Sequence, residues 1–172
     1  MQRSSAPPAV ADPPPATPSQ ARPGGLSLTG RALRYLSTRE HSRAELERKL
    51  APFDEPPGAL TKVLDALQAK GFINEARVVE SVVHRRASKL GASRIRQELQ
   101  AKGLEPQAVA EAVGQLRATE VQRATEVWRK KFGAAPADAR ERARQMRFLA
   151  SRGFGGDTIR RVVSGVEDDI GA

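Results

Sequence analysis

The stretch RFLASRGFGGDTIRRVVSGV, residues 147–166, repeats the pattern of QELQAKGLEPQAVAEAVGQL, residues 97–116. Both stretches run through a leucine, a basic residue and a glycine into a short polar turn. An apolar pattern follows, and its residues recur every three or four positions, which is typical of the buried face of an α-helix. Each stretch therefore predicts the end of one helix, a tight turn and the helix that comes after it.

The same register occurs a third time, nearer the N-terminus. Leu60 and Val109 are 49 positions apart, and Val109 and Ile159 are 50 positions apart. Three further sets keep these two offsets: Leu50, Leu99 and Leu149; Leu64, Val113 and Val163; and Leu67, Leu116 and Val166. Four apolar positions that recur three times at one spacing indicate an internal repeat.

Helical spacing continues from residue 28 to residue 166, while signals for β-strands are weak. Capping residues and prolines divide this region into nine predicted helices. The predicted starts are Thr29, Ser42 with Glu45 as a capping box, Pro56–Pro57, Asn74, Gly91 to Ser93, Pro106 and about Ala137. The seventh and ninth helices are predicted from their apolar residues, which include Val121 and Ile159.

Nine helices in three similar groups predict an all-α fold, an elongated and curved array of three tandem three-helix repeats. The expected repeats span residues 28–73, 74–117 and 118–167. One unit of this size buries little surface alone, so neighbouring units are expected to stack. Residues 1–25, rich in proline and alanine, carry almost no large apolar side chains, which predicts a disordered arm. Residues 168–172 are expected to form a short acidic tail.

The composition favours an anionic partner. The 172 residues include 29 Lys and Arg against 20 Asp and Glu, which gives a net charge of +9 at pH 7. A protein this basic suits a polyanion or an acidic protein surface. The chain has no cysteine, which excludes disulfides and thiolate metal sites. Its two histidines, His41 and His84, are interpreted as ordinary surface or turn residues.

Patterns for catalysis and membrane insertion are missing from the sequence. There is no phosphate-binding loop, and the glycines at 153–156 occupy the place of residues 103–106 in the second repeat, which favours a helix–helix turn. No nucleophile has a visible base, so neither an enzyme nor a cofactor is expected. No apolar run approaches the roughly 20 residues that span a bilayer, and the N-terminal residues lack the apolar h-region of a signal peptide, so a cytoplasmic protein is expected.

The second helix of each group is predicted to be its most basic element. Apolar stripes such as Ile95 and Leu99 take the inner face, so the basic residues beside them face outward or flank the seam. Stacked repeats would bring these residues to one surface, suited to a phosphate backbone or an acidic protein groove. The alternative is that each is a solvated residue paired with its own glutamate. The candidate partner-binding residues are Arg43, Arg48, Lys49, Arg85, Arg86, Lys89, Arg94, Arg96, Lys102, Arg144, Arg147 and Arg152.

Four segments of the chain resemble the RecX family. They are ALRYLSTREHSRAELERKL (32–50), GFINEARVVESVVHRRA (71–87), GASRIRQELQAKGL (91–104) and RQMRFLASRGFGGDTIRRVV (144–163). The resemblance covers roughly residues 28–166 and leaves out the proline-rich arm. One departure is Asn74–Glu75, where the family pattern often has an acidic pair, and Asn74 can still cap its helix.

The resemblance implies a regulator of the recombinase RecA that is built from tandem three-helix repeats. Such proteins bind RecA and lie in the groove of the RecA–ssDNA filament. They inhibit its ATPase, strand exchange and filament extension, and so modulate recombination, DNA repair and the SOS response. They are cytoplasmic, and they are neither enzymes nor cofactor carriers. A monomer with at most weak direct contact to DNA is expected.

Two other functions fit the residues. A nonspecific DNA-binding protein could place helix-turn-helix-like units against the phosphate backbone, although the basic faces offer few Asn or Gln side chains for reading bases. A helical-repeat scaffold for an unrelated protein is the third possibility.

Overall fold

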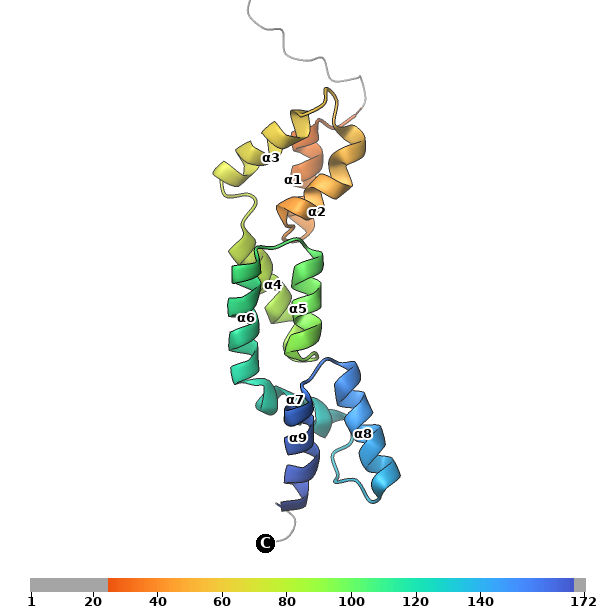
Figure 1. The fold of residues 1–172 in the computed structure, drawn as a ribbon. Coiled ribbons are helices and arrows are strands. Elements are labelled where there is room, and N and C mark those ends of the chain that lie inside the picture. The colour runs from red at the N-terminus through yellow and green to blue at the C-terminus, as the bar shows by residue number, and fades with distance from the viewer. Residues whose placement is uncertain (1–24, 169–172) are drawn as a thin grey trace, which may run out of the picture.

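The computed structural model describes residues 25–168, and within them the chain forms nine α-helices and one short 3₁₀ helix, with no β-strand (Figure 1). The predicted N-terminal arm and most of the predicted acidic tail lie outside these residues. The elements are α1 (Leu28–Thr38), α2 (Arg43–Leu50), η1 (Ala51–Phe53), α3 (Ala59–Ala69), α4 (Glu75–Arg86), α5 (Ala92–Ala101), α6 (Pro106–Ala118), α7 (Glu120–Lys131), α8 (Ala139–Ser151) and α9 (Gly156–Asp168).

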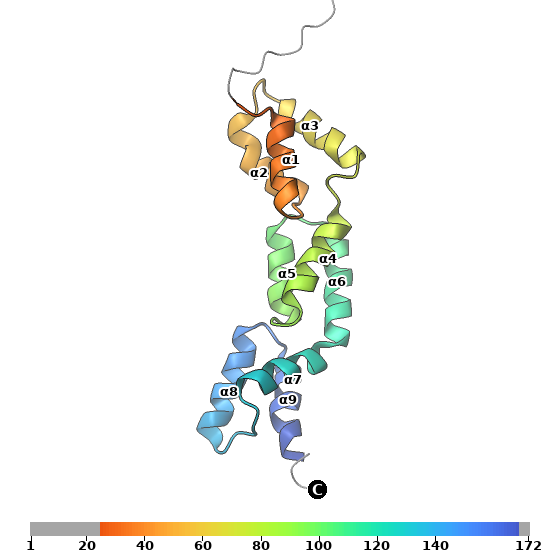
Figure 2. The same cartoon turned by 180° about the vertical axis from the view of Figure 1, so that it is seen from behind.

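The helices form three consecutive units along one elongated axis (Figures 1 and 2). Helices α1–α3 make one end, α4–α6 the middle and α7–α9 the other end. The predicted all-α array of three tandem three-helix repeats is confirmed. None of the helices between residues 25 and 168 has the length and apolar character needed to cross a membrane.

Each unit has an apolar core of its own, and the repeated positions of the sequence supply it. Leu50, Leu99 and Leu149 are 0% exposed. Two further sets of repeated positions are also buried: Leu60, Val109 and Ile159, and Leu64, Val113 and Val163. Burial of one such side chain contributes about 1.5–3 kcal/mol, so these positions hold each unit together.

Several helices begin where the sequence predicts. The Ser42 hydroxyl accepts a hydrogen bond from the Glu45 N–H at 3.1 Å, and the Glu45 carboxylate accepts one from the Ser42 N–H at 2.9 Å, which completes the capping box. The Asn74 side chain accepts from the Arg77 N–H at 3.0 Å. Pro106 is the first residue of α6, where its missing N–H costs nothing.

The predicted start of the third helix at Pro56–Pro57 is wrong. The helix begins at Ala59, because the Asp54 carboxylate folds residues 54–58 into a turn ahead of it. This carboxylate accepts hydrogen bonds from the N–H groups of Gly58 at 3.2 Å and Leu60 at 2.8 Å. A side chain of the preceding turn thus satisfies backbone donors at the helix start, which a proline inside the turn could not do.

Two other starts also differ from the prediction. Helix α1 is capped by Ser27, whose hydroxyl accepts from the Gly30 N–H at 3.1 Å, and not by Thr29. Helix α8 follows Asp138, which accepts from the Glu141 N–H at 2.7 Å. In both cases the capping side chain lies close to the expected position, and the error is one or two residues.

His41 is not the surface residue that the sequence predicts. It is 2% exposed, its ring packs against Tyr35 with 5.6 Å between centroids, and its Nδ1 lies 3.0 Å from the Arg39 carbonyl oxygen. Burial lowers the pKa of His41 and outweighs the hydrogen bond to Arg39, which raises it. The residue is therefore part of the packing of the first unit.

Candidate functional site

The second helices of the three units, α2, α5 and α8, lie end to end along the molecule (Figure 1). We call them the second-helix column. The backbone N–H of Gly91, at the start of α5, donates to the Arg152 carbonyl at the end of α8 at 2.8 Å, and the Ser93 N–H donates to the Gly153 carbonyl at 3.2 Å. At the other joint the Ser42 hydroxyl, at the start of α2, donates to the Lys102 carbonyl at the end of α5. The negative end of one helix dipole therefore meets the positive end of the next.

The joint between α8 and α5 depends on two glycines. A Cβ atom on Gly91 would lie 2.3 Å from the backbone of Gly153. Gly153 itself has a φ of +82°, and a Cβ atom there would lie 2.5 Å from Cγ of Arg94. The segments around Gly91 and Gly153 therefore approach each other backbone to backbone, which only glycine permits.

Glu120 secures the same joint from within. It is 7% exposed, and its carboxylate accepts from the Ala92 N–H at 2.9 Å, the Gly155 N–H at 3.3 Å and the Thr158 hydroxyl at 3.0 Å. One carboxylate thus binds the first turns of α5 and α9, where the helix dipoles favour negative charge. Sequence analysis missed this role, because an acidic residue at the start of a helix looks like an ordinary first-turn residue.

The joint between α5 and α2 is built from side chains. Lys102 Nζ lies 2.9 Å from Glu45 Oε1, and the same oxygen is 2.9 Å from Arg39. Burial alone would raise the pKa of Glu45, but the hydrogen bonds from Arg39, Lys102 and the Ser42 N–H together lower it to about 2. Lys102, one of the predicted partner-binding residues, is 12% exposed and serves this joint.

Nine of the twelve predicted partner-binding residues are exposed, namely Arg48, Lys49, Arg85, Arg86, Lys89, Arg94, Arg96, Arg144 and Arg147. The other three are half-buried. Besides Lys102 they are Arg43, which pairs with Glu47 at 2.9 Å and Asp65 at 2.7 Å, and Arg152, whose guanidinium lies 3.7 Å from the centre of the Phe148 ring. These three side chains are used within the fold.

Some of the exposed residues have partners of their own. Arg86 pairs with Glu98 at 2.9 Å, Arg48 donates to the Ala101 carbonyl at 3.1 Å, and Arg85 donates to the Ser81 carbonyl at 3.1 Å. Lys49 Nζ lies 4.8 Å from the centre of the Tyr35 ring. Exposed contacts of this kind contribute about 0–1 kcal/mol, so a binding partner can replace them at little cost.

Five of the exposed candidate arginines line three shallow hollows beside the column. Arg86 and Arg94 line one of about 390 Å³ between α4 and α5. Arg96 borders another of about 420 Å³ between α5 and α6, opposite Arg117. Arginines 140, 144 and 147 of α8 line the third, of about 470 Å³, together with the carboxylates of residues 138 and 141.

Arg117 and Arg140 are neighbours of this surface that the candidate set leaves out. Arg117 belongs to a third helix, and the prediction looked for basic residues chiefly on second helices. The i, i+4, i+7 spacing of Arg140, Arg144 and Arg147 would have indicated that these three share one helix face.

Chemically, these hollows suit anions. A guanidinium presents a planar fork of donors that matches a carboxylate or a phosphate. Residues 25–168 contain no group of three or more His, Asp or Glu side chains placed to hold a metal ion. The surface is therefore suited to recognition by charge and hydrogen bonding.

Fold and surface together define a class, the all-α tandem-repeat proteins with a basic face. Models of the first, second and third three-helix domains of RecX match residues 30–67, 74–113 and 118–163. The chain belongs to the RecX family, and the resemblance found in the sequence is confirmed.

Curated relatives cover most of the chain. Regulatory protein RecX of Leptothrix cholodnii is 59% identical over 138 residues, which are 80% of this chain and 88% of that protein. Regulatory protein RecX of Ralstonia nicotianae is 48% identical over 142 residues, which are 83% of this chain and 89% of that protein. Both are named as regulatory proteins.

Solved structures share the fold. The crystal structure of RecX from Lactobacillus salivarius matches 81% of this chain and 94% of its own with a TM-score of 0.67 and 21% identity. A second crystal structure, of regulatory protein RecX, matches 82% of this chain and 71% of its own with a TM-score of 0.64. At this level of identity the likeness concerns the fold alone.

Proposed function

We propose that this chain regulates the recombinase RecA. It binds RecA and the groove of the RecA–ssDNA filament, and it inhibits ATP hydrolysis, strand exchange and filament extension. Recombination, DNA repair and the SOS response are modulated in consequence. The proposed role needs no catalytic group and no cofactor, and it places a monomeric protein in the cytoplasm. Membership of a family of regulatory proteins supports it, and the observation that carries it is the basic second-helix column.

The column offers a mechanism for such binding. An elongated array with arginine-lined hollows on its middle and third units can follow a repeating acidic surface. Each exposed ion pair contributes only about 0–1 kcal/mol. Contacts made by linked units add through their effective concentration, so several weak contacts give firm binding. A protein held across neighbouring recombinase subunits would obstruct the movements that accompany ATP turnover.

Arg94 and Arg96 are the sharpest test of this surface. Both are exposed on α5, and they border different hollows. The double variant Arg94→Glu and Arg96→Glu reverses the charge of the middle unit. Lys130→Glu with Lys131→Glu makes the same change in charge on exposed residues of α7, outside the column, and serves as the matched control.

The experiment measures ssDNA-dependent ATP hydrolysis by RecA against increasing amounts of each protein, with binding to naked DNA measured alongside. We expect inhibition by the unaltered chain at substoichiometric amounts, together with weak binding to naked DNA. The α5 variant should need about tenfold more protein for the same inhibition, since two exposed ion pairs of up to about 1 kcal/mol each are lost and about 1.4 kcal/mol is a factor of ten. Equal inhibition by the folded α5 variant and the α7 control would remove the column from the mechanism.

The second candidate function is nonspecific DNA binding, which the arginine-lined hollows favour. In that case binding to naked DNA would be tight, and its logarithm would fall steeply with the logarithm of salt concentration. Inhibition would then appear only where the protein already saturates the DNA. The DNA titration above separates the two functions.

A further inference from the structure

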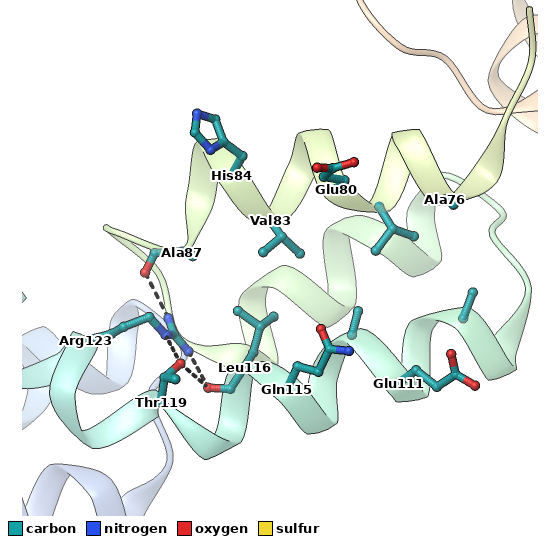
Figure 3. A pocket seen from close by; sticks show the side chains of 13 residues that line it. Ala76, Glu80, Val83, His84, Ala87, Glu111, Gln115, Leu116, Thr119 and Arg123 are labelled. Atoms are coloured by element: carbon teal, nitrogen blue, oxygen red, sulfur yellow. Dashed lines mark hydrogen bonds between the residues drawn. The ribbon is translucent and has the colours of Figure 1, made fainter.

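A groove of about 570 Å³ lies between α4 and α6 of the middle unit (Figure 3). Its walls are apolar, with Val79 and Val83 from α4 facing Ala108, Ala112 and Leu116 from α6. The groove is separate from the three arginine-lined hollows, which involve α4–α5, α5–α6 and α8.

The groove has the length of a short helix. Its lining runs from Ala76 to Ala87, along α4 and the residue after it, and from Ala108 to Thr119, along α6 and the residue after it. Both helices begin near the first unit and end near the third (Figures 1 and 2). Twelve helical residues rise about 18 Å, which is a little over three turns. The small side chains on both walls leave room for the apolar side chains of a helix laid between them.

The rim of the groove is acidic, in contrast to the rest of the molecule. Glu80 stands on the α4 side and Glu111 on the α6 side, and both are exposed (Figure 3). Among the described residues that line the groove, Arg123 is the only lysine or arginine. These two carboxylates distinguish the groove from the arginine-lined hollows of a chain whose net charge is +9.

Arg123 is already occupied as a brace at one end of the groove. Its guanidinium donates to the carbonyl groups of Ala87 at 2.9 Å and Leu90 at 2.7 Å, after α4, and of Leu116 at 2.8 Å, in α6. Burial lowers the pKa of Arg123 and the charge of Glu120 raises it, yet a guanidinium stays protonated in proteins. The brace fixes the ends of the two walls relative to each other, so the groove is formed before any partner arrives.

We propose that the α4–α6 groove is a docking site for an amphipathic protein helix whose apolar stripe is flanked on both sides by Lys or Arg. The apolar walls accept anchors at i, i+3 or i+4, and i+7, as in other helix-in-groove complexes. The carboxylates of Glu80 and Glu111 complement the basic flanks. The site goes beyond regulation through the column, because it selects a partner of the opposite charge and leaves the column free.

Two fluorescein-labelled peptides of about 15 residues, or about four turns, test the proposal with the full chain. Both carry Leu and Ala on the apolar stripe, and they differ only in having Lys or Glu on the flanks. Fluorescence anisotropy measures affinity, and methyl NMR locates the contact. We expect the Lys peptide to shift the methyl signals of Val79 and Val83 and to leave those of Val127 and Val162 in the third unit unchanged. Shifts confined to the third unit, or no binding by the Lys peptide, would overturn the proposal.

Variants sharpen the result. Glu80→Lys with Glu111→Lys should weaken the Lys peptide by about tenfold, since two exposed ion pairs are replaced by repulsion, and should bring the Glu peptide into the groove. Glu55→Lys with Glu126→Lys makes the same change in charge on exposed residues outside the groove. This control should bind the Lys peptide as the unaltered chain does and should not bind the Glu peptide in the groove. Both proteins are checked by circular dichroism. A peptide preference that is the same in the two variants would show that the rim does not select the partner.

A second pair of variants tests the walls. Ala76 is exposed and lines the groove, so Ala76→Trp should block it. Ala110→Trp adds the same side chain to an exposed position of α6 on the side of the arginine-lined hollow, and the Lys peptide should still bind. Unchanged binding by the folded Ala76→Trp protein would place the peptide outside the groove. Binding of the Lys peptide is measured without the recombinase, so its outcome does not depend on whether the column variants lose inhibition. The groove proposal and the proposed regulation of the recombinase can therefore fail separately.

Discussion

The Lys102 ammonium group lies 2.9 Å from the Glu45 carboxylate across the joint between the first and second units. The two residues are 57 positions apart in the chain, and both side chains are at most 12% exposed. Arg77 and Glu40 pair across the same two units at the same distance, but their side chains are 44% and 30% exposed, so the stability of the array should depend more on the buried Lys102–Glu45 pair.

Replacement of Lys102 by Met should therefore destabilise the protein. The substitution keeps the unbranched stem but removes the ammonium group, and it leaves the buried Glu45 with Arg39 and one backbone donor. We expect the free energy of unfolding in urea to fall by about 1–3 kcal/mol. Lys70→Met is the matched control, since Lys70 also ends a helix just before a glycine but is exposed. It should change stability by less than about 0.5 kcal/mol, and an equal loss in the two variants would contradict the role of the pair.

Stability should also fall with acid because of Glu45. Its pKa in the folded protein is about 2, below the ordinary value of 4.5, so the unfolded chain binds the proton more readily between these values. The contribution of Glu45 is fully present above about pH 5 and is lost as the pH falls towards 2. It amounts to about 2 kcal/mol after allowance for the solvent-screened Arg39. Urea unfolding at pH 7, 5 and 3 should show a shallower decline for Glu45→Gln than for the unaltered chain, and parallel declines would exclude Glu45 as the cause.

Gly91→Ala should disrupt the joint between α8 and α5. The new Cβ atom would lie 2.3 Å from the Gly153 backbone, so the two segments must move apart. Overpacking of this kind costs about 1–3 kcal/mol, which thermal unfolding can measure. Gly114→Ala supplies the comparison, because Gly114 lies inside α6 with open space around it. That change should stabilise the protein by up to about 1 kcal/mol. A neutral Gly91→Ala variant would mean that the joint adapts freely.

Glu120→Gln tests the buried carboxylate that binds α5 and α9. The amide keeps one acceptor oxygen, but the charge that faces two helix starts is lost. We expect about 1–3 kcal/mol of destabilisation and faster hydrogen exchange at the N–H groups of Ala92 and Gly155. Exchange at Leu60, whose N–H is bound by Asp54 in the first unit, should be unchanged. Uniformly faster exchange would point to global unfolding in place of a loosened joint.

The parts of this fold that a sequence can predict are the local and periodic ones. Leu50, Leu99 and Leu149 share a register that is visible in the letters, and all three are fully buried. The caps at Ser42 and Asn74 also follow from residues three positions apart. Such features depend on neighbours along the chain, so no knowledge of stacking is needed to find them.

The joints and the surfaces could not be predicted in the same way. Lys102 looked like one more basic residue on a second helix, and only the stacking of the units places it against Glu45. His41 is buried for the same reason of three-dimensional packing. The α4–α6 groove was also missed, because each of its walls reads as an ordinary amphipathic helix until the two are placed side by side.

The turn after α2 differs from its two counterparts in a way that limits the whole assembly. Four residues after the shared leucine, the second and third units have Gly103 and Gly153 with positive φ, and each receives the start of another helix. At that place the first unit has Asp54, with a φ of −74°, whose carboxylate is committed to its own chain. At the opposite end Asp138 caps α8. The column therefore starts at the capped end of α8 and ends at the turn after α2, so its length is set by the three units.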